Sequence, residues 1–362
     1  MKGIRVVIAG GGTGGHLYPG VAVARELLRR QPDAQVTFAG TARGLEATLV
    51  PKEGFELDVI RSAGLKGRSI VATLRGLALV PVSFADAWAL LSRRRPDAVV
   101  GLGGYSSGPV VMTAALRGIP TMLLEQNSVP GLTNRRLARV VRAAALTYDD
   151  VNNYFGRKAF VTGNPVRPEF FTQIINSQLS TSLGPKVLVL GGSQGSHALN
   201  VACVAASPEL VRRHPGLEVV HQTGQSDLAA VREGYGRAGV RARAESFLDG
   251  VAGEMTGADL VICRAGATTL AELAAVGRPA VLVPLPSAAD DHQRKNAQMF
   301  VNAGAAVMIE EKDVNAATLA GVVADLLKDS DRRARMGAAM KMLARPEAAA
   351  RIVDRLVELA AA

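Results

Sequence analysis

Gly10-Gly11-Gly12-Thr13-Gly14-Gly15-His16 is the stretch that decides the fold of the first half of the chain. An apolar run over 4–9 leads into it, and a helical pattern from Leu17 leads out. A strand, a glycine turn and a helix in this order are typical of a phosphate loop in a doubly wound parallel sheet. The first, third and sixth residues of the stretch fit GxGxxG, which alone is weak evidence for a dinucleotide site.

The next predicted strand argues against that cofactor. A dinucleotide fold places an acidic residue about 20 positions after the glycines, at the end of the second strand, where it holds a ribose. Here the second strand, 35–40, is followed by Thr41-Ala42, and the first carboxylate is Glu46. The sequence therefore does not favour a nicotinamide cofactor.

Length and composition indicate an ordinary globular protein. A chain of 362 residues with 48% hydrophobic residues is long enough for two domains. Its two cysteines, Cys203 and Cys263, lie far apart in apolar contexts, so we expect buried free thiols and a reducing cytoplasm. The first apolar run is too short for a signal peptide, and glycines and prolines interrupt the longest uncharged stretches, which argues against a membrane-spanning helix.

The positive charge is confined to the first half. Residues 1–165 hold 21 Lys and Arg against 11 Asp and Glu, and the rest of the chain holds 21 of each. This half is therefore expected to face a polyanion, namely a nucleic acid, an anionic membrane or a phosphorylated substrate. A basic surface that serves only solubility is the alternative.

Strand and helix patterns alternate twice along the chain. Strands are predicted at 4–9, 35–40, 56–61, 97–102, 120–124 and 144–148, and again at 186–190, 217–222, 243–248, 259–263, 280–284 and 305–310. This alternation predicts an α/β protein with two Rossmann-like domains facing each other across a cleft. We expect an N-terminal acceptor and membrane domain at 1–165, a C-terminal nucleotide domain at 166–340, and a last helix at 341–362 that crosses back to the first.

Three glycine-rich turns follow predicted strands. They lie at 10–15, 101–109 and 191–196, where ligands bind in open α/β sheets. Backbone amides can approach phosphate or sugar oxygens closely there. Each turn alone could be only a tight connection, but three together favour binding.

Polar residues at these strand ends are candidates for chemistry. His16 lies next to a helix N-terminus, which favours its neutral form and suits a general base, although a structural helix cap is the alternative. Glu125 and Asn127 end the strand 120–124 and are further candidates, unless they only organise the loop around Gly131 and Asn134. In the second half, Glu272 lies one turn into a helix whose amides suit a diphosphate, so it is a candidate for the ribose hydroxyls, with a solvated helix charge as the alternative.

A basic and apolar stretch lies between Arg61 and Arg95. Its cations rim a helical apolar surface, which is typical of a membrane-interface element, although a helix packed on the sheet is the alternative for part of it. The cations are Lys66, Arg68, Arg75, Arg93, Arg94 and Arg95. We expect no nucleic-acid partner, because aromatic stacking platforms and a Lys-rich run are missing from the sequence.

Six motifs that stand in order over residues 4–310 resemble one known family. They are Gly11-Gly12-Thr13-Gly14-Gly15-His16, Gly103-Gly104-Tyr105, Glu125-Gln126-Asn127, Gly163-Asn164-Pro165-Val166-Arg167, Gly191-Gly192-Ser193-Gln194-Gly195 and Cys263-Arg264-Ala265-Gly266-Ala267. Together they are similar to the MurG family of peptidoglycan N-acetylglucosaminyltransferases, which convert lipid I to lipid II.

The resemblance implies a GT-B fold and an inverting transfer of N-acetylglucosamine from UDP-N-acetylglucosamine to the C4 hydroxyl of lipid I. It implies a peripheral protein at the cytoplasmic face of the anionic cell membrane, working beside other cell-wall synthesis proteins, with no metal and no other cofactor. Catalytic candidates are His16, Asn127 and Glu125. Acceptor-side residues are Gly103, Gly104 and Tyr105. Donor contacts are implied at Thr13, Gly14, Gly15, Asn127, Arg167, Ser193, Leu248 (through its backbone, to uracil), Ala267, Thr268, Thr269, Leu270, Ala271, Glu272 and Gln293.

Two departures from the family pattern and two other functions stay open at this point. Residues 173–182 are unusually polar, and His292 stands where the family can have Gln. A non-hydrolysing UDP-N-acetylglucosamine 2-epimerase would share the two-domain layout but need no acceptor. A non-enzymatic scaffold would bind the UDP-sugar without releasing UDP.

Overall fold

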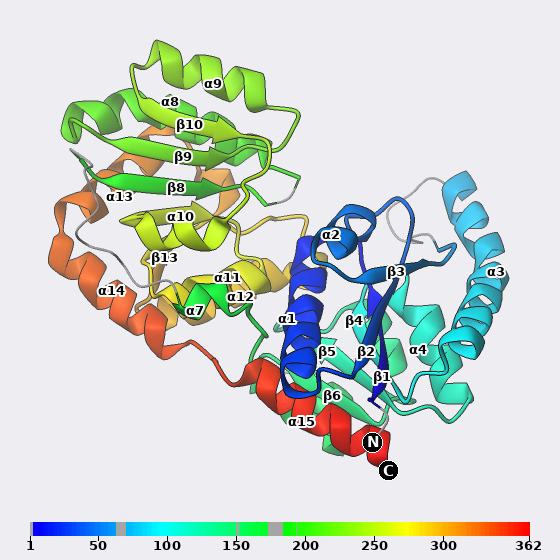
Figure 1. Ribbon diagram of the computed structural model, residues 1–362. Coiled ribbons are helices and arrows are strands. Elements are labelled where there is room, and N and C mark those ends of the chain that lie inside the picture. Colours follow the sequence, from blue (N-terminus) through cyan, green and yellow to red (C-terminus); the bar gives the residue numbers. More distant parts are fainter. Residues whose placement is uncertain (1–2, 63–69, 150–151, 173–183, 193) are drawn as a thin grey trace. The chain divides into compact units, whose positions relative to one another are not determined.

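The computed structural model describes residues 3–62, 70–149, 152–172, 184–192 and 194–362, apart from the side chains of 70–78 and of residues 152 and 289. The chain forms two compact units (Figure 1). The first comprises 1–167 together with 345–362, and the second comprises 168–344. The boundaries predicted from the sequence are 165 and 340.

The first unit is a parallel sheet covered by helices on both faces. Its strand order is β3-β2-β1-β4-β5-β6-β7, and every pairing is parallel. Its elements are β1 (Arg5–Gly10), α1 (Gly14–Arg30), β2 (Gln35–Gly40), α2 (Glu46–Lys52), β3 (Glu56–Val59), α3 (Ile70–Arg94), β4 (Ala98–Gly103), α4 (Ser107–Leu116), β5 (Thr121–Glu125), α5 (Leu132–Leu137), β6 (Ala143–Leu146), α6 (Asn152–Phe155), η2 (Gly156–Lys158), β7 (Ala159–Val161) and α15 (Ala348–Ala361).

Successive side chains of each strand point to opposite faces of this sheet, and they form a hydrophobic core on each face. Val6 and Ile8 pack with α1, α2 and α15, whereas Val7 and Ala9 pack with α3, α4 and α5. The last helix, α15, lies against α1. It buries Ile352 and Leu356 in the core that contains Val6 and Ile8. The C-terminal segment of the chain is thus part of the first unit.

The second unit repeats this architecture. Its strand order is β10-β9-β8-β11-β12-β13, again with every pairing parallel. Its elements are α7 (Glu169–Thr172), β8 (Lys186–Leu190), α8 (His197–Arg213), β9 (Glu218–Gln222), α9 (Leu228–Arg237), β10 (Arg241–Glu245), α10 (Val251–Gly257), β11 (Leu260–Cys263), α11 (Ala267–Val276), β12 (Ala280–Leu282), η3 (Ala289–Asp291), α12 (His292–Asn302), β13 (Ala306–Met308), η4 (Glu311–Asp313), α13 (Ala316–Lys328) and α14 (Ser330–Met342).

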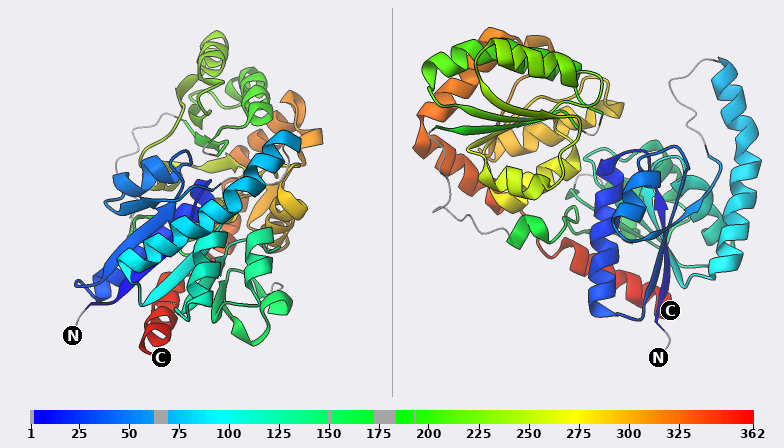
Figure 2. Two further views of the ribbon diagram at one scale, coloured as in Figure 1. Left: turned by 90° about the vertical axis from the view of Figure 1, so that its right-hand side faces the viewer. Right: turned by 45° about the horizontal axis from the view of Figure 1, so that its top comes forward.

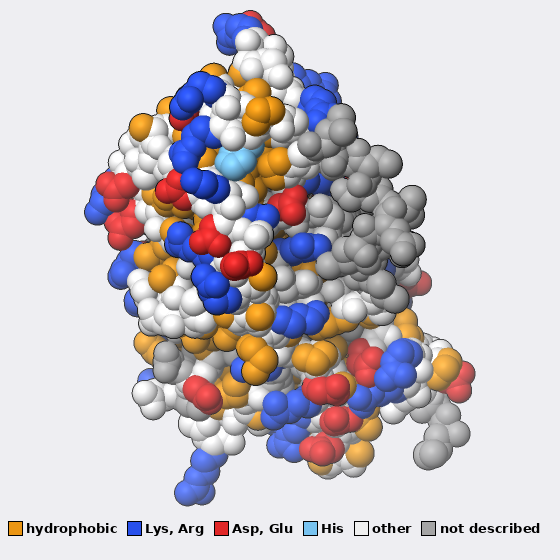
Figure 3. All heavy atoms as spheres, turned by 90° about the vertical axis from the view of Figure 1, so that its left-hand side faces the viewer, with side chains coloured by type: hydrophobic (Ala, Val, Ile, Leu, Met, Phe, Trp, Pro, Cys, Tyr) orange, Lys and Arg blue, Asp and Glu red, His pale blue; other side chains and the backbone are white. Residues whose placement is uncertain are grey.

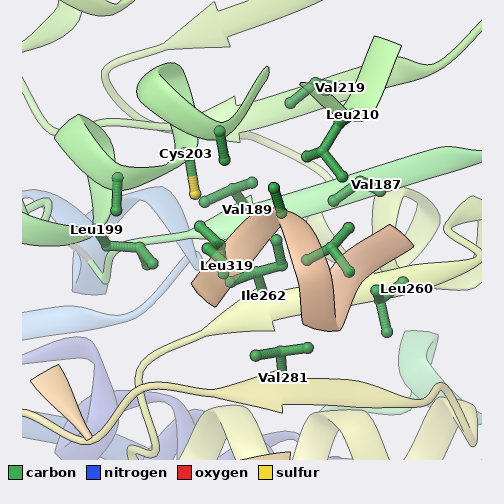
Figure 4. Close-up of a cluster of buried hydrophobic side chains, with 14 of the residues drawn as sticks. Val187, Val189, Leu199, Cys203, Leu210, Val219, Leu260, Ile262, Val281 and Leu319 are labelled. Atoms are coloured by element: carbon green, nitrogen blue, oxygen red, sulfur yellow. The ribbon is translucent and has the colours of Figure 1, made fainter. Parts of the chain in front are cut away.

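Helices α8, α9 and α13 cover one face of the second sheet, and α10, α11 and α12 lie on the other, as the right-hand view of Figure 2 shows. The first group encloses a core of Val, Leu and Ile side chains from alternate strand positions (Figure 4). Cys203 lies in this core and Cys263 ends β11; both thiols are free and buried, and burial raises the pKa of each to about 12. The prediction of buried free thiols is therefore confirmed.

The prediction of two Rossmann-like domains with parallel sheets is confirmed, and two strands differ in detail. Strand β10 ends at Glu245, whereas the apolar residues Phe247 and Leu248 extended the prediction to 248. Strand β7 was not predicted, because only three residues, Ala159–Val161, pair with β6 at the edge of the sheet. The polar segment at 173–182 lies outside the described residues.

Candidate functional site

The strand orders define one switch point in each unit. The chain order reverses between β1 and β4 in the first sheet and between β8 and β11 in the second. Ligands of open α/β sheets bind outside the carboxyl ends of the strands at this point. The glycine-rich turns after β1, β4 and β8, and the start of α11 after β11, all follow strands that flank a switch point. The fold therefore brings the predicted motifs to the two edges where binding is expected.

In the first unit, the turn after β4 packs directly on the turn after β1. Gly12, Gly103 and Gly104 have φ angles of 91°, 91° and 81°, a region that side chains rarely adopt. A Cβ on Gly104 would lie 2.8 Å from the carbonyl oxygen of Gly11. Glycine is therefore required there by both conformation and space. Tyr105 follows with 55% of its surface exposed.

His16 lies in the first turn of α1, over the turn after β4. Its Nδ1 is 3.3 Å from Thr13 Oγ1, so the hydroxyl can fix the orientation of the ring. A Cβ on Gly103 would lie 3.6 Å from His16 Nε2 and 3.6 Å from Asn134 Nδ2. The half-buried imidazole thus has its Nε2 edge toward Gly103, at the switch point of the sheet.

Glu125 is a buried carboxylate that accepts hydrogen bonds from its own loop. Oε1 accepts from the Asn127 amide at 3.1 Å, and Oε2 accepts from the Gly131 amide at 3.0 Å and from Asn134 Nδ2 at 2.9 Å. Only 2% of the residue is exposed, and burial raises the pKa of its carboxyl group, against the effect of these hydrogen bonds. This geometry matches the loop-organising alternative, so we drop Glu125 as a proton acceptor for a substrate.

The other implied donor residues of the first unit lie near the start of α1, except Asn127, which follows β5. Gly14 and Gly15 begin the helix, and Thr13 precedes it in extended conformation. Arg167, the last residue before the second unit, places its guanidinium 3.9 Å from the centroid of the Tyr18 ring on α1. Asn127 is half-buried, with its Nδ2 3.5 Å from Glu125 Oε1.

In the second unit, Arg264 ties the strand ends together. It follows β11, is 9% exposed, and donates to the carbonyls of Val283 and Pro284 at 3.1 and 3.2 Å. Its Nη2 donates to Ser196 Oγ at 2.6 Å and also pairs with Glu311. The guanidinium therefore connects the third glycine turn to the end of β12. Ser193 lies outside the described residues.

Helix α11 begins at this edge with Ala267, after Gly266 as N-cap. Its first turns contain five implied donor residues and end on Glu272, which is 7% exposed. The alternative of a solvated helix charge is therefore wrong for Glu272. The five residues are Ala267, Thr268, Thr269, Leu270 and Ala271.

Gln293 lies at the start of α12 and accepts a hydrogen bond from the Leu285 amide at 3.0 Å. The two residues before this helix, Asp290 and Asp291, have left-handed φ angles of 52° and 57°. This turn brings His292 and Gln293 to the end of β12, the same edge as α11.

Gln222 is a residue of this edge that sequence reasoning missed. It ends β9, where its Nε2 donates to the Gly192 carbonyl at 2.8 Å and its Oε1 accepts from the Leu248 amide at 3.0 Å. One side chain thus fixes both the third glycine turn and the implied uracil contact. Its place at the end of the predicted strand 217–222 was the available signal, but the two contacts lie 30 and 26 residues away.

The structure changes the interpretation of the basic stretch. Arg93 and Arg94 pair with Asp58 at 2.8 and 2.7 Å, so much of their charge is offset within the protein. Lys66 and Arg68 lie outside the described residues, as does the side chain of Arg75. On α3, Trp88 is 57% exposed, with the Arg117 guanidinium 4.7 Å from its ring centroid.

Among the described residues, no group of three or more His, Cys, Asp and Glu side chains is arranged to hold a metal ion. Within the same parts of the chain, every helix is too short or too polar to cross a bilayer.

Comparisons with known proteins agree with these motifs. Residues 6–146 match the glycosyltransferase family 28 N-terminal domain, and residues 186–352 match the family 28 C-terminal domain. The UDP-N-acetylglucosamine–N-acetylmuramyl-(pentapeptide) pyrophosphoryl-undecaprenol N-acetylglucosamine transferase of Anaeromyxobacter dehalogenans (strain 2CP-C) is 47% identical over 98% of this chain and 93% of its own.

Solved structures are similar over nearly the whole chain. Acinetobacter baumannii MurG is 29% identical, with a TM-score of 0.75 over 98% of this chain and 99% of its own. The UDP-GlcNAc 2-epimerase of Neisseria meningitidis, bound to UDP-GlcNAc, has a TM-score of 0.68 over 99% and 100%, but at 14% identity it shows the fold alone. The chain therefore belongs to the MurG family of glycosyltransferases, within glycosyltransferase family 28.

Proposed function

We propose that this protein transfers N-acetylglucosamine from UDP-N-acetylglucosamine to lipid I and so forms lipid II. The observation that carries the proposal is 47% identity, over 98% of the chain, to a transferase named for this reaction. The glycine turns at both switch points support it, because a protein that only binds the UDP-sugar would need only those of the second unit. The epimerase alternative has support from the fold alone.

The reaction we infer is a direct displacement with inversion. The C4 hydroxyl of the acceptor attacks the anomeric carbon of the sugar, and His16 accepts the hydroxyl proton. The bond from the anomeric carbon to the diphosphate breaks, and UDP leaves with the electron pair. Backbone amides at the start of α11 and in the third glycine turn stabilise the negative charge on the leaving group. Thr13 supports this role, because its hydroxyl can hold the imidazole ring in one orientation.

UDP release with and without a lipid I analogue tests the function. Release that requires the analogue, together with formation of a disaccharide product, supports the proposal. Conversion of UDP-N-acetylglucosamine without an acceptor would favour the epimerase, and binding without UDP release would favour the scaffold. Either of these two results would overturn the transferase assignment.

Gln222 gives a test of the donor side. Replacing it with methionine keeps the volume but removes both hydrogen bonds, so the third glycine turn and the Leu248 amide lose their common partner. We expect the Kd of UDP to rise about tenfold, or about 1.4 kcal/mol, because part of the roughly 2 kcal/mol that the two hydrogen bonds contribute to holding these backbone groups is lost from binding. Isothermal titration with UDP measures this change.

A control for this titration replaces another glutamine with methionine. Gln298 on α12 bonds only Asn302 in its own helix among the described contacts, so Gln298→Met should leave the Kd unchanged. Gln222→Glu keeps an oxygen that accepts from the Leu248 amide, but its second oxygen would face the Gly192 carbonyl oxygen and repel it. We expect this variant to raise the Kd of UDP at least as much as Gln222→Met. Unchanged UDP affinity in both Gln222 variants would contradict the proposed role.

We further propose that the first unit binds an anionic membrane surface through the side formed by α3 and α4. The excess of Lys and Arg in residues 1–165 supports this proposal, as does exposed Trp88 with Arg117 beside it. Leu116, at the end of α4, adds an apolar side chain that is 75% exposed. By contrast, on the face drawn in Figure 3 the Lys and Arg side chains lie among Asp and Glu side chains.

Substitution of Trp88→Ser together with Arg117→Gln should weaken binding to anionic vesicles. We expect a loss of about tenfold or more, because one exposed ring and one cation each contribute about 1 kcal/mol or more at an interface. Co-sedimentation with phosphatidylglycerol vesicles measures it. Arg213→Gln, which removes a cation paired with Asp325 in the second unit, is the matched control. Equal binding by the wild type and the double variant would refute this membrane surface.

A further inference from the structure

Glu46 is a buried carboxylate beneath the first glycine turn. It is the first residue of α2 and is 1% exposed. Its Oε2 accepts a hydrogen bond from the Gly12 amide at 2.8 Å. Its Oε1 accepts from the Thr41 amide at 2.9 Å and from Thr41 Oγ1 at 2.7 Å. The side chain therefore joins the turn after β1 to the end of β2.

Three glycines make room for this carboxylate. A Cβ on Gly11 would lie 2.4 Å from Glu46 Cδ, and one on Gly44 would lie 2.1 Å from Oε2. A Cβ on Gly40 would lie 2.6 Å from Glu46 Cγ. Any side chain at these positions would displace the carboxylate, so Gly11 of the turn, with Gly40 at the end of β2 and Gly44 between β2 and α2, fits around an anion that belongs to the protein itself.

The carboxylate is charged in this position. Burial raises the pKa of Glu46, but the hydrogen bonds from Gly12 and Thr41 outweigh this effect and hold the pKa below its ordinary value. In a phosphate-binding loop, a phosphate oxygen accepts the hydrogen bonds of the turn amides. Here a carboxylate oxygen already accepts from Gly12, and a phosphate at the same amide would meet a like charge at close range.

The second unit differs at the comparable place. The first carboxylate after β9 is Asp227, just as Glu46 is the first carboxylate after β2. Asp227 turns to α8, where its Oδ2 accepts from Asn200 Nδ2 at 2.8 Å and lies 3.0 Å from His197 Nδ1. The two units thus share one fold, but among the described residues only the first unit has this carboxylate bound to its glycine turn.

We propose that Glu46 is a positioning and specificity-determining residue, which fills the anion site of the first glycine turn. It holds Gly12, and through it Thr13 and His16, in the geometry needed for transfer, and it excludes a diphosphate from this turn. The part of the proposal that concerns transfer rests on the proposed function. The glycine spacing that suggests a dinucleotide site thus encloses an internal anion instead.

Chemical rescue of Glu46→Ala by formate tests the proposal. The shorter side chain leaves space in which a small carboxylate can accept the same hydrogen bonds. We expect kcat to fall on the order of tenfold or more, because the residues on the turn are displaced, while the Kd of UDP, whose implied contacts lie mostly in the second unit, stays within about twofold. Formate should restore most of the lost kcat, and sodium chloride at equal ionic strength should not.

Two variants and one binding measurement control this experiment. Glu46→Gln fills the same space with a neutral amide, so formate should not rescue it. Glu53→Ala removes a carboxylate that pairs with Arg25 beside the other end of α2, and it should show neither the loss nor the rescue. With saturating UDP present, Glu46→Ala should also bind inorganic pyrophosphate, which the wild type should not bind under these conditions.

The outcomes separate this proposal from the proposed function. If formate raises the melting temperature of Glu46→Ala more than that of the wild type, the anion site is supported, even if the wild type transfers no sugar. If Glu46→Ala does not fold, a normal kcat in Glu46→Gln overturns the positioning role, and a lowered kcat with an unchanged Kd of UDP supports it. Absence of both rescue and stabilisation by formate in folded Glu46→Ala overturns the proposal.

Discussion

Replacing His16 with alanine should lower the turnover of sugar transfer by a factor of about 10² or more. The reason is that the proton of the acceptor hydroxyl then has no positioned acceptor when the new bond forms. The Nε2 edge of His16 lies at the switch point, over Gly103, while its Nδ1 is close to the hydroxyl of Thr13. Steady-state UDP release with a lipid I analogue measures the effect.

A pH profile distinguishes a base from a structural histidine. In the wild type, kcat/KM should fall on the acid side as the base becomes protonated, and this limb should disappear in His16→Ala. His214, which caps the far end of α8 and contacts the Ala324 carbonyl, provides the control, and His214→Ala should keep turnover within about twofold. Near-normal turnover in folded His16→Ala would exclude the proton-accepting role.

Replacing Arg264 with methionine should destabilise the second unit by about 3 kcal/mol. The substitution leaves the Glu311 carboxylate without its buried partner and removes the donors to Ser196 Oγ, Val283 and Pro284. Urea unfolding followed by hydrogen exchange in β11 and β12 measures this loss.

The first unit serves as an internal reference for that measurement. The only tryptophan of the chain, Trp88, lies in the first unit, so its fluorescence reports on this unit while hydrogen exchange reports on the second. We expect the urea midpoint measured by Trp88 fluorescence to be the same in Arg264→Met as in the wild type. The double variant with Glu311→Gln should recover part of the loss, because no partly buried carboxylate is then left unpaired. Equal stability of the wild type and Arg264→Met would show that these contacts contribute little.

The sequence predicted the strands and turns because their signals are local. An apolar run that ends in glycines, such as 4–12, predicts a buried strand and a close backbone approach without knowledge of the rest of the chain. Parallel strands then bring all their carboxyl ends to one edge, so His16, Gly103 and Glu125 were expected together from topology alone. The six motifs also predicted the family to which the chain belongs.

The roles of the acidic residues could not be predicted in the same way. Glu125 was a candidate base by its position at a strand end, but its oxygens accept from Asn127, Gly131 and Asn134. Arg93 and Arg94 were expected to bind a membrane, but they pair with Asp58 on a neighbouring strand. A charge is visible in the sequence, whereas its partner depends on which segments the fold brings together.

The first glycine turn shows this division most clearly. By itself, the sequence determined a strand, a turn that needs glycine and a helix, because backbone conformation and hydrophobic period are local properties. It also showed that the ribose carboxylate of a dinucleotide fold is missing after Thr41. Only the tertiary structure decided what the turn encloses, since Glu46 reaches Gly12 across 34 residues of chain. A hydrogen bond between such distant residues depends on the packing of β1 beside β2, which no local pattern encodes.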